Sequence, residues 1–415
     1  MARPLRRSPR PLVAVVVLGC VAALLSGCVN AAREGIDDVY EHDTIGTFYD
    51  VPDPLPHGEP GQLIKARELL GAPAGAKAWR ILYHSTDQDG NDIAVSGVVV
   101  APDDPSIGHE RTVVSWAHPT TGAEGKRCAP STGIDPFILM EGLDSLLRAG
   151  YVVAATDYSN MGAEGPASYL IGDTEGRNVL DAARAAQELR ASNAGTKTLL
   201  WGHSQGGQAA LFAGQIQPSY APDLDLKGVA VAAPAGELGE LLSADIDDVS
   251  GVTIGSYAFG AFQEAYADEY PDLELTSVLT PEGAAIVPDM MELCLLGQNK
   301  QLHAIATPLI GRFLAEDPTK VEPWATFLEE NTPGAEEIDV PVLVSQGLKD
   351  QLVKPETTDS LVQHLCDTGD QVQYKTYPGA DHGTVAYRTV PLLIPWMKAR
   401  VADQPLAEDS IACQD

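Results

Sequence analysis

The feature that most constrains the fold is a short apolar segment leading into a glycine-flanked serine and then into a helical pattern. Residues 198–201 read Thr-Leu-Leu-Trp, residues 202–206 read Gly-His-Ser-Gln-Gly, and residues 204–215 have helical periodicity. A serine at such a strand-to-helix turn stands on a sharp, strained backbone, where side chains at positions 202 and 206 would collide with neighbouring elements. This context favours Ser204 as an exposed nucleophile over the alternative, a glycine-rich turn with an idle serine.

Strand-like and helix-like segments alternate on both sides of this turn. Strand patterns occur at residues 93–101, 112–116, 151–156, 198–201, 229–233, 340–345 and 372–377, and helical patterns at residues 136–148, 176–191, 204–215 and 391–400. Such alternation predicts an α/β fold with a mostly parallel central sheet and helices on both faces. Residues 236–337 break the rhythm with helical stretches at 256–270 and 283–296. We therefore expect a helical cap inserted between two late core strands.

The N-terminal segment is predicted to be an export signal. Residues 1–11 hold four arginines and no acid, residues 12–25 form an apolar run too short to span a bilayer, and Leu25-Ser-Gly-Cys28 resembles a bacterial lipobox. We expect cleavage before Cys28, lipidation of that cysteine, and a protein exported to the outer face of the cell membrane. A plain secretory signal is the alternative. The predicted organisation is a signal peptide at 1–27, a lipidated tether at 28–60, a core in two parts at 61–235 and 338–415, and the cap at 236–337.

The chain is strongly acidic, with 58 Asp and Glu against 27 Lys and Arg and a formal net charge of −31. An acidic surface repels nucleic acid and anionic lipid headgroups, so we expect neither as a partner. We also predict a monomer.

Six cysteines are present, of which Cys20 belongs to the signal and Cys28 to the lipobox; the other four are Cys128, Cys294, Cys366 and Cys413. An even number in an exported protein predicts two disulfides, but the spacing allows three pairings and does not choose among them. Four free thiols are the alternative. No cysteine or histidine spacing indicates a metal site.

A serine hydroxyl becomes an effective nucleophile when a histidine takes its proton and a carboxylate orients that histidine. In sites of this type the chain order is serine, acid, histidine. Asp350 follows the strand pattern at 340–345, and His382 lies in a glycine-flanked loop after the pattern at 372–377. We predict Ser204 as the nucleophile, Asp350 as the orienting acid and His382 as the base.

Each assignment has a competitor. Asp381 adjoins His382, but neighbours in sequence rarely face each other. His364 lies in a helical pattern, His303 lies in the predicted cap, and His203 stands inside the serine turn and cannot easily turn back to the serine. His382 is therefore the preferred base.

The negative charge that develops on a reacting carbonyl oxygen is stabilised by N–H donors. Gln205 supplies one at a helix N-terminus beside the serine. A second is expected in the loop after residues 112–116, where Pro119 has no N–H and Thr120 is the predicted donor. A turn without catalytic duty is the alternative for this loop.

Together these residues resemble the secretory lipase family of the α/β-hydrolases, which includes fungal lipase A enzymes and actinobacterial secreted esterases. The resemblance runs from roughly Tyr40 to the end and is carried by residues 115–122, 128–131, 157–158, 175–184, 202–207, 347–353 and 382–383. It implies an α/β-hydrolase core with a cap, hydrolysis of apolar acyl esters without a cofactor, and the site residues named above. It also implies disulfides Cys128–Cys294 and Cys366–Cys413.

The leading hypothesis is a serine carboxylic-ester hydrolase, of lipase or esterase type, that forms an acyl-enzyme on Ser204. An acyltransferase would share that acyl-enzyme and is the alternative among enzymes. A non-catalytic cell-surface binding protein is less favoured, because all three residues of the predicted triad are present. The apolar stretch at residues 257–262 is predicted either to line an acyl pocket or to form the core of the cap.

Overall fold

The computed structural model describes residues 47–104 and 109–413, and Tyr49–Asp415 form one compact unit. The predicted signal peptide, Cys28 and most of the predicted tether lie outside the described residues. Near the end of that tether Tyr49 is buried, and its hydroxyl group hydrogen-bonds to Ser131 Oγ at 2.8 Å. Among the described residues, no helix has both the length and the apolar character needed to cross a bilayer.

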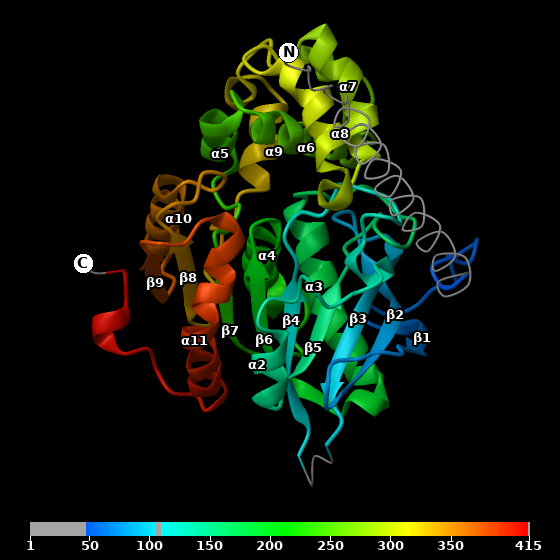
Figure 1. Ribbon diagram of the computed structural model, residues 1–415, viewed down its shortest axis with the longest axis vertical. Coiled ribbons are helices and arrows are strands. Elements are labelled where there is room, and N and C mark those ends of the chain that lie inside the picture. The colour runs from blue at the N-terminus through cyan, green and yellow to red at the C-terminus, as the bar shows by residue number, and fades with distance from the viewer. Residues whose placement is uncertain (1–46, 105–108, 414–415) are drawn as a thin grey trace, which may run out of the picture. The chain divides into compact units, whose positions relative to one another are not determined.

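Within the described part of the chain, a nine-stranded sheet forms the centre of the compact unit (Figure 1). Its strands, in the order in which they lie side by side, are β1 (Leu63–Glu68), β2 (Ala76–Thr86), β3 (Asp92–Pro102), β5 (Val152–Thr156), β4 (Arg111–Ala117), β6 (Ala194–His203), β7 (Asp225–Ala232), β8 (Val342–Gly347) and β9 (Val372–Tyr377). The pairs β1–β2, β2–β3 and β3–β5 are antiparallel, and every later pair is parallel. The sheet confirms the predicted α/β fold.

Helices cover both faces of this sheet, as a mostly parallel sheet requires. One face carries α3 (Gly172–Glu188), α4 (Gln205–Tyr220) and α10 (Pro355–Thr368), and the other carries α2 (Leu143–Arg148) and α11 (His382–Val401). Short 3₁₀ turns occur at Pro130–Thr132, Arg190–Ser192, Leu275–Ser277, Thr307–Leu309, Pro318–Lys320 and Glu408–Ser410.

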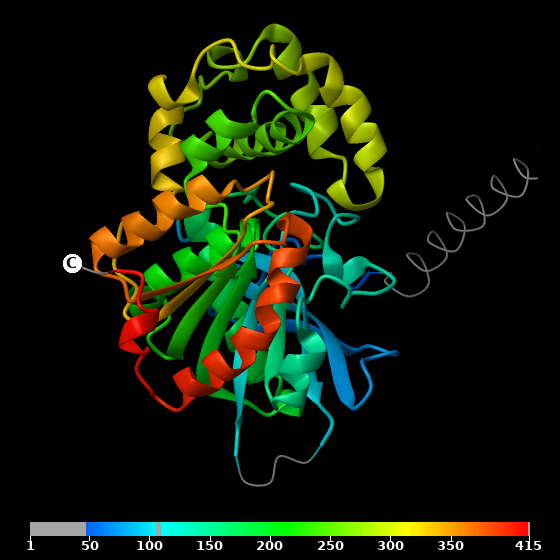
Figure 2. The same cartoon turned by 60° about the vertical axis from the view of Figure 1, so that its left-hand side comes forward.

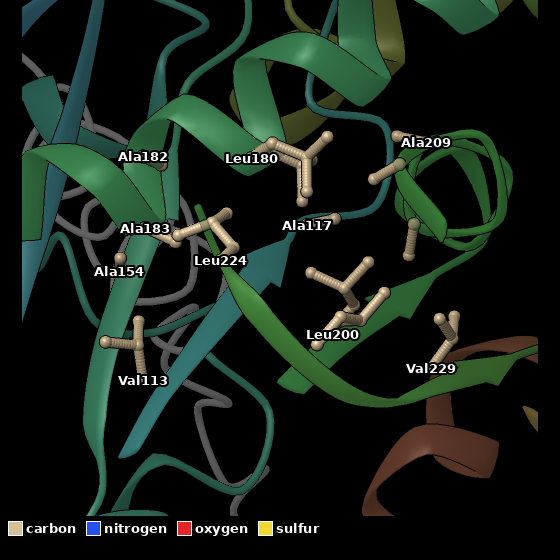
Figure 3. Packing of buried hydrophobic residues seen from close by; sticks show 14 of the residues in the cluster. Val113, Ala117, Ala154, Leu180, Ala182, Ala183, Leu200, Ala209, Leu224 and Val229 are labelled. Carbon is tan, nitrogen blue, oxygen red and sulfur yellow. The ribbon is translucent and has the colours of Figure 1, made fainter. Parts of the chain in front are cut away.

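Figure 3 shows part of the larger core, between the sheet and helices α3 and α4. The helices contribute Leu180, Ala183 and Ala209, and the strands contribute Val113 and Leu200, all fully buried. The small alanines on the helices let α3 and α4 pack closely, so the turn that begins α4 is supported by a rigid layer.

The cap consists of the helices that follow β7 and precede β8 (Figures 1 and 2). They are α5 (Leu238–Asp245), α6 (Val249–Ala265), α7 (Pro281–Met291), α8 (Leu295–Ala306) and α9 (Trp324–Glu330). The cap has its own apolar core, in which Phe259, Phe262, Trp324 and Phe327 are buried. The same cluster includes Tyr169, Leu170 and Ile171, so the cap helices pack on one another and on the loop that precedes α3.

Several segments differ from the elements predicted from the sequence. The cap helix predicted at 256–270 is α6, Val249–Ala265, and strand β1 was not predicted. The helix expected over 136–148 begins only at Leu143, because Gly142 adopts a left-handed conformation (φ 89°) that interrupts the helical path. The last helix begins at His382 rather than Pro391, and it runs through that proline. Strand β2 was not predicted because Arg80 and His84, which are buried in the structure, disrupt its apolar pattern.

Two disulfides cross-link the described part of the chain. Cys128 is bonded to Cys294, and Cys366 to Cys413, with Cα–Cα distances of 5.0 and 5.2 Å. The first connects the loop after β4 to the start of α8 in the cap, and the second connects α10 to the C-terminal segment. This is the pairing that the resemblance implied and that the spacing alone left open.

Candidate active site

Ser204 occupies the turn between β6 and α4 with φ 58° and ψ −118°. A residue with a side chain adopts such a conformation only when the surrounding structure enforces it. Two glycines make the turn possible: a Cβ atom on Gly202 would overlap the carbonyl oxygen of Gly206, and one on Gly206 would overlap that of Ala117. The expected steric reason for both glycines is therefore present in the structure.

His382 and Asp350 lie beside this serine. His382 Nε2 is 3.0 Å from Ser204 Oγ, and His382 Nδ1 is 2.8 Å from Asp350 Oδ2. The other oxygen of Asp350 accepts hydrogen bonds from the backbone N–H groups of Leu352 and Val353, both at 2.9 Å. These two donors fix the carboxylate, so its remaining oxygen can hold the imidazole in one orientation.

The competing residues are engaged elsewhere. Asp381 is exposed and forms a capping box with Thr384 at the start of α11. His364 Nδ1 is 3.1 Å from Glu237 Oε1, and His303 is exposed on α8. None of these side chains contacts Ser204.

His203 has a different place in the site. Its ring lies against the ring of His382, with 4.9 Å between the centroids, and its Nδ1 is 3.0 Å from Glu141 Oε1. Glu141 and His203 are both buried. The pair therefore packs against one face of the imidazole of His382 and leaves both of its ring nitrogens to Ser204 and Asp350.

Thr120 and Gln205 flank the serine, and both line the same cavity as Ser204. In the part of the chain that the structure describes, neither backbone N–H donates to a protein acceptor. Two such N–H groups near a serine hydroxyl are an arrangement suited to stabilising an oxyanion. The Thr120 hydroxyl group and the Tyr169 hydroxyl group form a hydrogen bond of 2.9 Å.

Two residues without a role predicted from the sequence support Thr120 and Gln205. Tyr169 holds Thr120 as described, and Glu175 Oε1 accepts a hydrogen bond of 2.6 Å from the side chain of Gln205. Burial raises the pKa of Glu175 well above its usual value of 4.5. Burial also lowers the pKa of His118 to about 4, so this residue of the β4 loop is neutral at pH 7.

A cavity of about 160 Å³ adjoins Ser204 and His382. Its walls are mostly apolar and come largely from the cap; they include Leu241, Leu242, Ile254, Ala258, Phe259 and Phe262. Ligand sites of this character are apolar with a few convergent polar groups. Here the polar groups near the serine include the His382 ring and the backbone N–H groups of Thr120 and Gln205.

Residues 257–262 lie partly in the cap core and partly at the cavity. Phe259 and Phe262 line the cavity and also belong to the buried core of the cap, whereas Tyr257 lies fully buried behind the wall and donates to the Leu293 carbonyl. One acid, Asp245, also lines the cavity, and it forms an ion pair of 2.8 Å with Lys354. Among the described residues, no group of His, Cys, Asp and Glu has the arrangement of a metal site.

The mostly parallel sheet, the strained serine turn after β6 and the cap between β7 and β8 define an α/β-hydrolase fold. Comparison of the sequence with known families then places it more narrowly. The chain belongs to the secretory lipase family, whose sequence model matches residues 129–409.

Curated relatives extend this match over most of the chain. Lipase 10 of Candida albicans is 26% identical over 396 residues, which cover 86% of this chain and 81% of the relative. A probable inactive lipase of Mycobacterium tuberculosis is 25% identical, over 88% of this chain and 83% of the relative.

Solved structures are similar in fold. Candida antarctica lipase A has a TM-score of 0.72 at 19% identity, covering 88% of this chain and 87% of that chain. The rice cell wall degrading esterase LipA of Xanthomonas oryzae has a TM-score of 0.65 at 20% identity, covering 84% of this chain and 99% of that chain.

Proposed function

We propose that this protein hydrolyses carboxylic esters of apolar acids through an acyl-enzyme on Ser204. The observation that carries the proposal is the hydrogen-bonded series from Ser204 Oγ through His382 to Asp350, next to an apolar cavity. Family membership supports it but is not sufficient, because one relative is described as a probable inactive lipase. The geometry of this chain's own residues is therefore the stronger support.

In the acylation step, Ser204 Oγ attacks the ester carbonyl carbon while His382 Nε2 accepts the hydroxyl proton. The carbonyl oxygen becomes an oxyanion, which the N–H groups of Thr120 and Gln205 stabilise. Each such donor contributes about 3–4 kcal/mol to transition-state stabilisation in comparable enzymes. When the tetrahedral intermediate collapses, the C–O bond to the alcohol breaks, and His382 returns the proton to the leaving alkoxide.

In the deacylation step, water attacks the acyl carbonyl and gives a proton to His382. The second tetrahedral intermediate collapses, the carboxylic acid leaves, and Ser204 regains its proton. Asp350 does not take the proton in either step. It keeps Nδ1 protonated so that Nε2 faces the serine, and it stabilises the imidazolium that forms transiently.

The cap supplies the apolar site for the acyl chain. Alkyl groups leave water favourably, by about 0.8 kcal/mol per methylene, and Leu241, Ala258 and Phe262 offer them a surface beside the serine. The acyl group of an apolar ester therefore binds in the orientation that presents its carbonyl to Ser204.

Residues 1–28 are proposed to direct export and membrane attachment. The leader pattern and the family's secretory character support export, and Leu25-Ser-Gly-Cys28 supports attachment of the mature protein to the membrane by a lipid on Cys28. The mass of the mature N-terminal peptide tests this: a diacylglycerol thioether on Cys28 is expected, and an unmodified cysteine would contradict it.

The function is tested with purified protein lacking residues 1–28 and p-nitrophenyl esters of different acyl lengths. Ser204→Ala is expected to lower kcat by about 10⁶-fold, as loss of the nucleophile does in enzymes with this triad. Ser219→Ala is the matched control, because Ser219 is an exposed serine near the other end of α4. Equal rates from native protein and Ser204→Ala, with both folded, would refute ester hydrolysis through Ser204.

A further inference from the structure

Glu175 is a buried acid that takes no part in the proton transfers described above. It lies on α3, which packs beside α4, and its side chain is fully buried. Its Oε1 accepts one hydrogen bond from the Gln205 side chain at 2.6 Å and another from the Leu170 backbone N–H at 3.3 Å. One carboxyl oxygen therefore joins the turn that carries Ser204 to the loop at residues 169–170, which lines the same cavity.

Leu170 is held in an unfavourable conformation by these contacts. Its φ is 58°, which is rare for a residue with a branched side chain. Glu175 binds its N–H, and the side chain of Gln208 donates to its C=O at 3.2 Å. Strain of this kind persists where the surrounding structure over-determines it, and it is common at functional sites.

The residue before Leu170 connects this loop to the second N–H donor. The hydroxyl group of Tyr169 lies 2.9 Å from Thr120 Oγ1, and Thr120 supplies one of the two N–H groups proposed to bind the oxyanion. The other N–H belongs to Gln205, whose side chain is bound directly by Glu175. The contacts of Glu175 therefore reach both donors, one directly and one through residues 169–170.

We propose that Glu175 is a positioning residue that sets the spacing of the two oxyanion donors, Thr120 and Gln205, from a single buried side chain. This inference rests on the proposed function. Catalysis is sensitive to such spacing, because a misplacement of about 1 Å can lower the rate by about 100-fold.

This role does not require a negative charge on the carboxyl group, because both hydrogen bonds to its Oε1 come from neutral N–H donors. Burial raises the pKa of Glu175 well above 4.5, and the titratable groups that face it, Tyr158 and Tyr169, carry no positive charge. Among the described residues, its Oε2 atom has no partner, and neither does Gln205 Oε1. A glutamine at position 175 is neutral, has the same shape and keeps an accepting oxygen. We therefore expect Glu175→Gln to preserve both hydrogen bonds.

The test compares Glu175→Ala, Glu175→Gln and a control on the same helix, Asp181→Asn. Asp181 is equally buried on α3 but bonds to Ser85, Tyr220 and Arg184, away from the donors. Two readouts are needed: kcat and KM for p-nitrophenyl hexanoate, and the Ki of an alkyl trifluoromethyl ketone. Ser204 Oγ adds to the ketone carbonyl, its proton passes to His382, and the oxygen becomes an oxyanion, so the Ki reports directly on the two donors.

Glu175→Ala is expected to lower kcat and raise Ki by about 100-fold each, with KM changed by less than about threefold. Glu175→Gln and Asp181→Asn are expected to keep kcat and Ki within about threefold of native. The inference is overturned if Glu175→Ala keeps native kcat and Ki, if Glu175→Gln falls as far as Glu175→Ala, or if Asp181→Asn falls equally.

If Glu175→Ala does not fold, Gln205→Leu breaks the same contact from the other side while it keeps the backbone donor. A Ki raised about tenfold with KM unchanged is then expected, and an unchanged Ki overturns the inference. Failure of this inference can be distinguished from failure of the proposed function. Native activity that is lost in Ser204→Ala but insensitive to residue 175 refutes only this inference, whereas a native protein inactive on all esters refutes both.

Discussion

The cavity beside Ser204 predicts which acyl chains the protein prefers. An apolar cavity of roughly 150 Å³ is known to accommodate benzene, a ligand of six carbons, and this cavity measures about 160 Å³. We therefore expect kcat/KM to rise with acyl length to an optimum near six carbons. Each added methylene contributes about 0.8 kcal/mol, so the rise from acetyl to hexanoyl esters is about 3 kcal/mol, or about 200-fold.

Substitution of one wall residue tests this reasoning. Ala258 lines the cavity from α6, and Ala258→Leu fills the space of about three acyl carbons. The expected loss is about 2.4 kcal/mol for hexanoyl esters, or about 50-fold in kcat/KM, with acetyl esters changed by less than about threefold. Kinetics on p-nitrophenyl esters from two to sixteen carbons measure both profiles.

Ala267→Leu is the control for this substitution, since Ala267 is an exposed cap residue that does not line the cavity. Its profile should match that of the native protein. Identical profiles for Ala258→Leu and native protein, or a native optimum at sixteen carbons, would refute the assignment of this cavity to the acyl chain.

Three further substitutions follow from the structure. Asp350→Asn should lower kcat by about 10⁴-fold with little change in KM, because His382 loses the partner that fixes its tautomer; steady-state kinetics with a loss below tenfold would contradict this role. Replacing Cys128 and Cys294 by alanine opens a loop of 166 residues and should lower the free energy of unfolding by up to about 5 kcal/mol; a loss below 1 kcal/mol in urea unfolding would show that the cross-link hardly stabilises the fold. Burial raises the pKa of Asp181 to about 6, so the folded state holds a proton that the unfolded state releases, and stability falls as pH rises from about 4 through 6. Asp181→Asn removes this dependence. Between pH 4 and pH 7 the free energy of unfolding of the variant should therefore rise by about 3 kcal/mol relative to that of the native protein. Urea unfolding curves that give parallel pH profiles for the two proteins would contradict this.

The central layer of the fold could be predicted because its signals are local. Strands β4 and β6 are apolar runs bounded by turn residues, and the glycines at 202 and 206 are required by the turn itself. Strand β2 was missed because two buried charged or titratable side chains, Arg80 and His84, interrupt its pattern. Arg80 donates to the Ser131 carbonyl, 51 residues further along the chain, and the His84 ring bonds to Asp92 at the start of the adjacent strand β3. The apolar pattern of the strand does not reveal either contact.

The candidate site could also be predicted only in part. Ser204, Asp350 and His382 each follow a strand of the parallel part of the sheet, and the carboxyl ends of parallel strands meet at one edge, so their proximity could be anticipated. The roles of Glu175 and Tyr169 could not, because they depend on how α3 packs beside α4 and on the strained backbone at Leu170. Such contacts are set by tertiary packing rather than by sequence spacing.

The most direct test of the central claim is to locate the nucleophile chemically. A fluorophosphonate with a short alkyl chain should react once per molecule, and peptide mass spectrometry should place the label on Ser204. His382→Ala should react far more slowly, and Ser204→Ala should not react at all. Labelling of a different serine, or ester hydrolysis by a protein in which Ser204 stays unlabelled, would contradict the assignment of Ser204 as the nucleophile.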